Sequence, residues 1–117
     1  MLKFYWYPKC STCRKAKAWL DQAGVAYETI DLVQDTPSAA SFEKWLSSSE
    51  LPIRRFFNTS GMKYRELGLK DKMDELSVEE ASELLASDGM LVKRPLLINK
   101  DQFLLNGFKE VTYERTF

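Results

Sequence analysis

Two cysteines, Cys10 and Cys13, are the residues of this chain whose type and spacing could do chemistry. Thiolates are nucleophiles, and two cysteines separated by two residues can form a disulfide with each other. A free thiol has a pKa of about 8.5, so only about 3% of it is thiolate at pH 7. Reactivity near neutral pH therefore requires surroundings that lower the pKa of one of the two.

The segment around the pair predicts such surroundings. An apolar run at residues 2–7 favours a strand. Residues with helical spacing follow it at Cys13, Ala16, Leu20 and Ala23. Gly24 should end this helix, and Cys10 should precede its first turn, where free N–H groups and the helix dipole favour an anion. We therefore expect Cys10 to be an activated nucleophile and Cys13 to be its resolving partner.

Three basic residues next to the pair, Lys9, Arg14 and Lys15, are expected to lower the pKa of Cys10 further. The residues alone leave a second interpretation open, in which both cysteines are buried and inert or form a small structural disulfide. Such a short loop would stabilise the fold by about 2 kcal/mol. The sequence has no secretory apolar segment and no long apolar span, so we expect a cytoplasmic protein without a membrane anchor. A C-x-x-C pair in that compartment is more often catalytic or redox-sensing than structural.

The composition argues against several other classes of function. Lys and Arg together number 17, as do Asp and Glu, so direct binding to nucleic acid is not expected. Histidine is absent, which removes the commonest metal ligand and general base. Two cysteines cannot complete a structural zinc site. We therefore expect neither a metal nor a bound cofactor.

The periodicity predicts one α/β domain over residues 1–117 with a mixed sheet. A second strand at residues 25–31 would complete a βαβ unit. A helix at 38–48 would open a helical insertion at about 37–90, in which a short apolar helix lies near residue 53 and a capping box at 77–80 starts another helix. The apolar face of that last helix should be formed by Val78, Ala81, Leu84 and Leu85. A β-hairpin at 93–105 with a polar turn at 99–102 and a short terminal helix would follow.

Four motifs in this order carry a resemblance to a known family. They are the Cys10-Ser-Thr-Cys13-Arg14-Lys15 stretch, the segments 64–69 and 89–96, and the Asn106-Gly107-Phe108 step. Together they resemble the arsenate reductase-like ArsC/Spx/MgsR family over essentially the full length. The resemblance implies a thioredoxin-like fold with a helical insertion, a nucleophile at Cys10, an oxyanion-binding arginine at Arg94 and a cis peptide bond before Pro95.

The chain departs from both branches of that family. Its arsenate reductases carry two further arginines, where this chain has Asn58 and the step at 107–108, and they usually lack a cysteine at the position of Cys13. The Spx and MgsR branch, which the C-x-x-C resembles, regulates transcription by binding RNA polymerase. The segment 47–51 lacks the glycine that Spx proteins use in that contact.

Two hypotheses about function stay open. The first is a thiol-dependent oxidoreductase that reduces an oxyanion or a mixed disulfide through Cys10, Cys13 and Arg94. Its partner would be a small thiol or a redoxin, with glutathione and glutaredoxin or thioredoxin as external reductant. The second is a redox-sensing regulator whose disulfide changes its binding to RNA polymerase.

Overall fold

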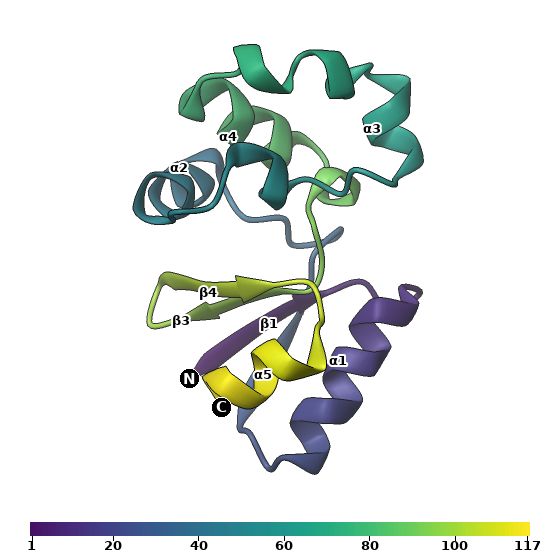
Figure 1. Cartoon of the computed structure of the whole chain (residues 1–117), viewed down its shortest axis with the longest axis vertical. Helices are drawn as coiled ribbons and strands as arrows, with labels where there is room; N and C mark the ends of the chain where they lie inside the picture. Colours follow the sequence, from purple (N-terminus) through teal and green to yellow (C-terminus); the bar gives the residue numbers. More distant parts are fainter. The chain divides into compact units, whose positions relative to one another are not determined.

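The computed structural model describes all residues from 1 to 117 and has an α/β architecture. The chain forms two compact units, one made of Met1–Asp31 with Arg94–Phe117 and the other of Leu32–Lys93 (Figure 1). The expected single domain over the whole chain stays a prediction. No helix combines the length and the apolar character that crossing a membrane requires.

The first unit contains a four-stranded mixed sheet in the order β2-β1-β3-β4. Its elements are β1 (Leu2–Trp6), α1 (Ser11–Gln22), β2 (Tyr27–Asp31), β3 (Leu96–Asn99), β4 (Gln102–Asn106) and α5 (Glu110–Thr116). Strand β1 pairs with β2 in parallel and with β3 in antiparallel orientation, and β3 pairs with β4 in antiparallel orientation. This arrangement confirms the predicted βαβ unit followed by a hairpin.

Both helices of this unit cover the same face of the sheet (Figure 1). The core between them contains residues from both helices and from three strands, namely Leu2, Phe4, Ala16, Leu20, Leu97, Leu105 and Tyr113. Trp19 on α1 and Tyr113 on α5 meet edge to face with their ring centroids 5.5 Å apart. Gly24 follows the helix with a φ of +72°, as the predicted end of α1 requires.

The hairpin is tighter than the sequence predicts. Only Lys100 and Asp101 form the turn, with φ values of 53° and 63°, and Asn99 pairs with Gln102. A two-residue turn with both φ values positive matches the twist of antiparallel strands, so it extends the pairing into the predicted four-residue turn. Strand β3 also begins at Leu96 and not at Lys93.

The second unit is helical, as predicted. It comprises α2 (Ala39–Ser48), α3 (Met62–Glu66), α4 (Val78–Ser87) and the 3-10 turns η1 (Ile53–Phe56), η2 (Leu69–Asp71), η3 (Met73–Glu75) and η4 (Gly89–Leu91). Helices α2 and α4 pack against each other. The sequence analysis did not predict α3, which is five residues long. The helix ends shortly before Gly68, a residue in the left-handed conformation.

Gly89 stands where two distant parts of this unit meet. A Cβ atom at this position would lie 2.3 Å from the carbonyl oxygen of Leu32 and 2.9 Å from its carbonyl carbon. The backbone at the start of the unit therefore occupies the space that any side chain at residue 89 would need.

Helix α4 starts with the predicted capping box. The Ser77 hydroxyl accepts a hydrogen bond from the Glu80 N–H at 3.1 Å, and the Glu80 carboxylate accepts one from the Ser77 N–H at 3.1 Å. The predicted apolar face is only partly right, because the fully buried positions are Ala81, Ser82 and Leu85. The Ser82 hydroxyl has no hydrogen-bond partner although the residue is 1% exposed.

The two serines of α4 should therefore respond to alanine in opposite directions. Ser77→Ala removes a cap and should lower the free energy of unfolding by about 1 kcal/mol. Ser82→Ala removes an unsatisfied buried hydroxyl and should raise it by up to about 1 kcal/mol. Urea titration of both variants checks this pair, and a loss of stability in Ser82→Ala would mean that its hydroxyl has a partner.

Gly89→Ala should lower the free energy of unfolding by about 3 kcal/mol, because the new methyl group collides with backbone that cannot move aside easily. Gly68→Ala is the matched control in the same unit. It meets no atom within 4 Å, and only its φ of +62° is unfavourable for alanine. We expect the control to lose about 1 kcal/mol. Equal losses in the two variants would contradict the close approach.

Candidate active site

The two cysteines lie where β1 passes into α1. Cys10 is the N-cap of the helix, with extended backbone, and α1 begins at Ser11. The Cys10 N–H donates to the Tyr7 carbonyl at 2.9 Å, which closes a turn with Pro8 at its second position. The predicted place of Cys10 in front of a helix is confirmed.

Cys13 is one turn further along the helix and is fully buried. Its sulfur accepts a hydrogen bond from the Tyr7 N–H at 3.5 Å. Burial raises the pKa of the Cys13 thiol to about 12. The Tyr7 N–H and Arg94 oppose this rise, and the nearby Cys10 adds to it. Cys13 is therefore a protonated thiol at neutral pH.

Cys10 is half-buried and its pKa moves in the opposite direction. Partial burial raises the pKa of the Cys10 thiol, but interactions with the backbone N–H and the thiol of Cys13 and with the Arg94 guanidinium lower it below its ordinary value. The Cys10 side chain makes no hydrogen bond that caps α1. The backbone N–H of Cys13 is nevertheless close enough to stabilise a thiolate at Cys10. The site therefore separates the two thiols into a nucleophile and a proton-bearing partner.

Arg94 reaches the cysteines through the pairing of β3 with β1. Leu96 pairs with Tyr5, so the residues just before β3 lie beside the end of β1. The Arg94 Cζ atom lies 5.3 Å from the centroid of the Tyr7 ring. The peptide bond between Arg94 and Pro95 is cis, as the family resemblance implies.

The cation that lowers the pKa of Cys10 is thus Arg94. The sequence instead pointed to the neighbouring Lys9, Arg14 and Lys15, all of which are exposed. Closeness in the sequence did not identify the cation, because the pairing of β3 with β1 brings Arg94, which is distant in the sequence, to the Cys10 sulfur. Sequence reasoning also missed Tyr7, whose aromatic type beside a proline carries no signal of its contact with Arg94.

The step at Gly107 lies next to this site. The Gly107 N–H donates to the Pro95 carbonyl at 2.9 Å, and the Gly107 carbonyl accepts from the Tyr113 hydroxyl at 2.8 Å. Burial raises the pKa of Tyr113, and the nearby Cys13 adds to this effect. The backbone of Gly107 is thus held on both sides, within the step at 107–108 where the family resemblance implies an arginine in arsenate reductases.

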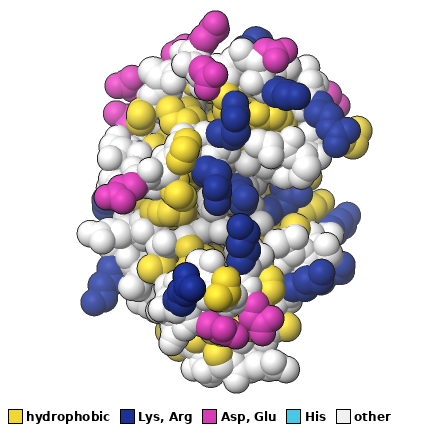
Figure 2. All heavy atoms as spheres, viewed as in Figure 1, with side chains coloured by type: hydrophobic (Ala, Val, Ile, Leu, Met, Phe, Trp, Pro, Cys, Tyr) yellow, Lys and Arg dark blue, Asp and Glu magenta, His cyan; other side chains and the backbone are white.

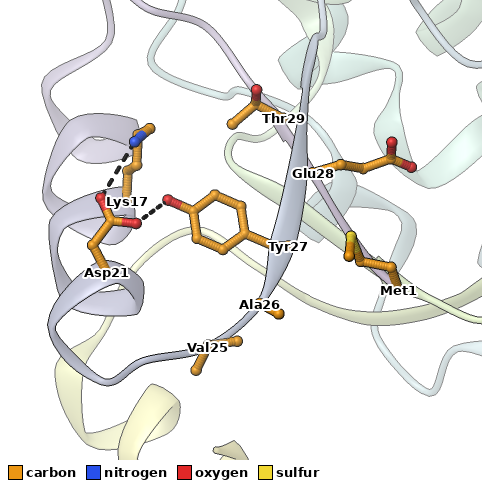
Figure 3. A pocket seen from close by; sticks show the side chains of 8 residues that line it. All are labelled: Met1, Lys17, Asp21, Val25, Ala26, Tyr27, Glu28 and Thr29. Carbon is orange, nitrogen blue, oxygen red and sulfur yellow. Dashed lines mark hydrogen bonds and ion pairs between the residues drawn. The ribbon is translucent and has the colours of Figure 1, made fainter.

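An open hollow elsewhere in the first unit contains no cysteine (Figure 3). It is lined by residues that include Lys17, Asp21 and Tyr27. Asp21 accepts hydrogen bonds from the Tyr27 hydroxyl and from the Lys17 ammonium, the latter at 3.3 Å. Lys17 and Asp21 are thus engaged with each other, and no cysteine lines the hollow.

The charges on the surface do not single out another site. On the face drawn in Figure 2, most Lys and Arg side chains lie in the middle and toward the right, most Asp and Glu side chains lie toward the two ends and the left edge, and apolar side chains lie among the basic ones. No three side chains of types that bind metals are gathered in one place. The cysteine pair with Arg94 is therefore the candidate active site.

The two cysteines should differ strongly in alkylation by iodoacetamide. The rate at Cys10 should rise with pH to a midpoint below the ordinary thiol pKa of about 8.5, and at pH 7 Cys13 should react at least about tenfold more slowly. Peptide-resolved mass spectrometry measures both rates on the intact protein. A faster Cys13 would contradict the assignment of the nucleophile.

The same assay identifies the responsible cation. Arg94→Ala should move the midpoint of Cys10 to higher pH, because the thiolate loses the positive charge that stabilises it. Arg14→Ala is the matched control, since it removes an exposed arginine next to Cys13 and should leave the midpoint unchanged. A larger shift in the Arg14 variant would restore the explanation from sequence neighbours.

Known proteins agree with the fold and the motifs. The chain is 49% identical over 116 residues to the uncharacterized protein YusI of Bacillus subtilis. The aligned residues cover 99% of this chain and 98% of YusI. It is 30% identical over 104 residues to the regulatory protein MgsR of the same organism, across 89% of this chain and 81% of MgsR.

Solved structures agree as well. A crystal structure of a possible arsenate reductase from Streptococcus mutans superposes with a TM-score of 0.94 at 50% identity, over 100% of this chain and 98% of that one. The thioredoxin-like fold implied by the sequence motifs is therefore confirmed. The family model for ArsC matches residues 5–116. This chain belongs to the ArsC family.

Proposed function

We propose that this protein is a thiol–disulfide oxidoreductase in which Cys10 is the nucleophile, Cys13 the resolving cysteine and Arg94 the group that binds negative charge. The observation that carries the proposal is the different placement of the two thiols, since Cys10 is half-buried at the N-cap of α1 whereas Cys13 is fully buried one turn further on. In agreement with this placement, the pKa of Cys10 is lowered and that of Cys13 is raised. A structural or inert pair has no need of such a difference. Membership in the ArsC family supports thiol redox chemistry in general.

The reaction proceeds in two exchanges. The Cys10 thiolate attacks one sulfur of a substrate disulfide, forms a mixed disulfide and releases the other half as a thiolate. Cys13 then gives up its proton, and its thiolate attacks the Cys10 sulfur. This step releases the second half of the substrate and leaves a Cys10–Cys13 disulfide. The released thiolates take up the protons, and the substrate disulfide is reduced by the two electrons that the cysteine pair loses.

An external reductant completes the cycle. Glutathione with glutaredoxin, or thioredoxin, would supply two thiols, become a disulfide and return Cys10 and Cys13 to the reduced state. The chain has no histidine to act as a base, so the proton of Cys13 passes to a leaving thiolate or to water. Cys13 is fully buried, so its natural reaction partner is the adjacent Cys10.

Cysteine variants test the proposal with a small mixed disulfide as substrate. Cys10→Ser should abolish exchange, because the nucleophile is gone. Cys13→Ser should still perform the first exchange but retain half of the substrate on Cys10, which intact-mass spectrometry detects as an adduct. Exchange that survives in Cys10→Ser, or an adduct on Cys13, would refute these roles of the two cysteines.

A turnover assay with arsenate as substrate distinguishes disulfide exchange from arsenate reduction. An arsenic oxyanion on Cys10 needs several converging donors, and removing one such contact typically costs about 3 kcal/mol in the transition state. By the family resemblance, the chain has Asn58 and the step at 107–108 where arsenate reductases carry two further arginines. We therefore expect turnover with arsenate, glutathione and glutaredoxin to be slow or undetectable. Robust turnover that collapses in Arg94→Ala would overturn this expectation.

A redox-sensing transcriptional regulator is the second candidate. It is favoured by the similarity to the regulatory protein MgsR and, at 28% identity over 110 residues, to the global transcriptional regulator Spx of Streptococcus agalactiae. In this case the Cys10–Cys13 disulfide would control binding to RNA polymerase. A pull-down with purified polymerase under reducing and oxidising conditions tests it, with Cys13→Ser as the variant that cannot form the disulfide.

A further inference from the structure

Tyr7 contacts three members of the candidate active site. Its carbonyl accepts a hydrogen bond from the Cys10 N–H at 2.9 Å, and its N–H donates to the Cys13 sulfur at 3.5 Å. Its ring lies 5.3 Å from the Arg94 Cζ atom. The two backbone contacts are open to any residue except proline at this position, whereas only an aromatic side chain can make the third.

Arg94 needs such a contact to stay near the sulfur. The pairing of Leu96 with Tyr5 fixes the backbone of this segment, but the arginine side chain has several rotatable bonds beyond it. A guanidinium is planar and weakly hydrated, so it stacks well on the negative face of an aromatic ring. The separation of 5.3 Å lies within the range of about 6 Å over which this attraction acts.

We propose that Tyr7 is a positioning residue, whose ring face holds the Arg94 guanidinium beside the Cys10 sulfur in the reduced protein. The inference deepens the proposed function, since it concerns the same site. It is independent of any substrate, because it describes how the free protein holds Arg94 near Cys10. Arg94 and Cys13 are the charged and titratable groups that act on Cys10, and Tyr7 acts through the first of them.

The first test replaces the ring and measures the alkylation rate of Cys10 by iodoacetamide at pH 6.5 in the full chain. Tyr7→Leu should slow alkylation about threefold, the size of effect expected for a half-buried cation–π contact, and should shift the pH midpoint upward. Tyr7→Phe keeps the ring face and should retain a rate close to that of the original protein. An unchanged midpoint in Tyr7→Leu would overturn the proposal.

Tyr27→Leu is the matched control. Tyr27 is also a half-buried tyrosine of the first unit beside a cation, with the Lys17 ammonium 5.8 Å from its ring centroid, but it does not contact Arg94. This variant should leave the midpoint of Cys10 unchanged. An equal shift in both variants would show a general loss of structure and would also overturn the proposal.

A double variant shows whether Tyr7 acts through Arg94. If it does, Tyr7→Leu should slow alkylation little further once Arg94→Ala is present, so the two effects should not multiply. Multiplying effects would assign Tyr7 an independent influence on Cys10 and exclude the positioning role.

A shape-preserving substitution covers the case in which Tyr7→Leu fails to fold. Pentafluorophenylalanine in place of Tyr7 keeps the ring but removes the negative charge from its face. Compared with Tyr7→Phe, it should raise the midpoint of Cys10. Identical midpoints would refute the proposal, while disulfide exchange by the same proteins would report separately on the proposed function.

Discussion

The hydrogen bonding of β1 to a strand on each side is the constraint on which the candidate active site depends. Its parallel pairing with β2 requires a crossover, and α1 supplies it, so that Cys10 begins a helix directly after the strand. Its antiparallel pairing with β3 brings the chain back at the end of β1, where Arg94 comes just before the strand. One central strand thus places two distant parts of the sequence around a single sulfur.

The position of each cysteine within the first turn of α1 decides its chemistry. Cys13 shares the inward face of the helix with Ala16 and Leu20, so burial keeps its proton in place. Because its pKa in the folded protein lies above the value of about 8.5 in an unfolded chain, the thiol favours the fold at neutral pH. This contribution is lost as the pH rises toward the folded value of about 12. Cys10 opens the helix as its N-cap, since its carbonyl accepts a hydrogen bond from the Arg14 N–H at 3.1 Å, and the donors around its sulfur favour the anion.

The sequence was most informative where local rules determine the structure. Helix α1 with Cys10 at its N-cap, the capping box of α4 and the succession of a βαβ unit and a hairpin along the chain all follow from spacing, caps and turns. The resemblance to a family supplied Arg94 and the cis bond at Pro95, which periodicity cannot reveal. The sequence analysis missed the unpartnered Ser82 hydroxyl, because its burial depends on packing between helices. It also missed the contact of the Tyr7 ring with Arg94, because the two residues are far apart in the sequence.

The contact between Gly89 and Leu32 closes the helical unit on itself, because the backbone near its exit touches the backbone at its entrance. On the sheet side, Asp31 pairs with Trp6 and Leu96 pairs with Tyr5, so the strands that lead into and out of this unit flank the same end of β1. Two interstrand spacings of about 4.8 Å separate them. We therefore expect a segment whose two ends meet in this way to be exchangeable as a module. Evolution, or an engineer, could replace residues 32–93 with another closed segment while the strand pairing that builds the cysteine site stays intact.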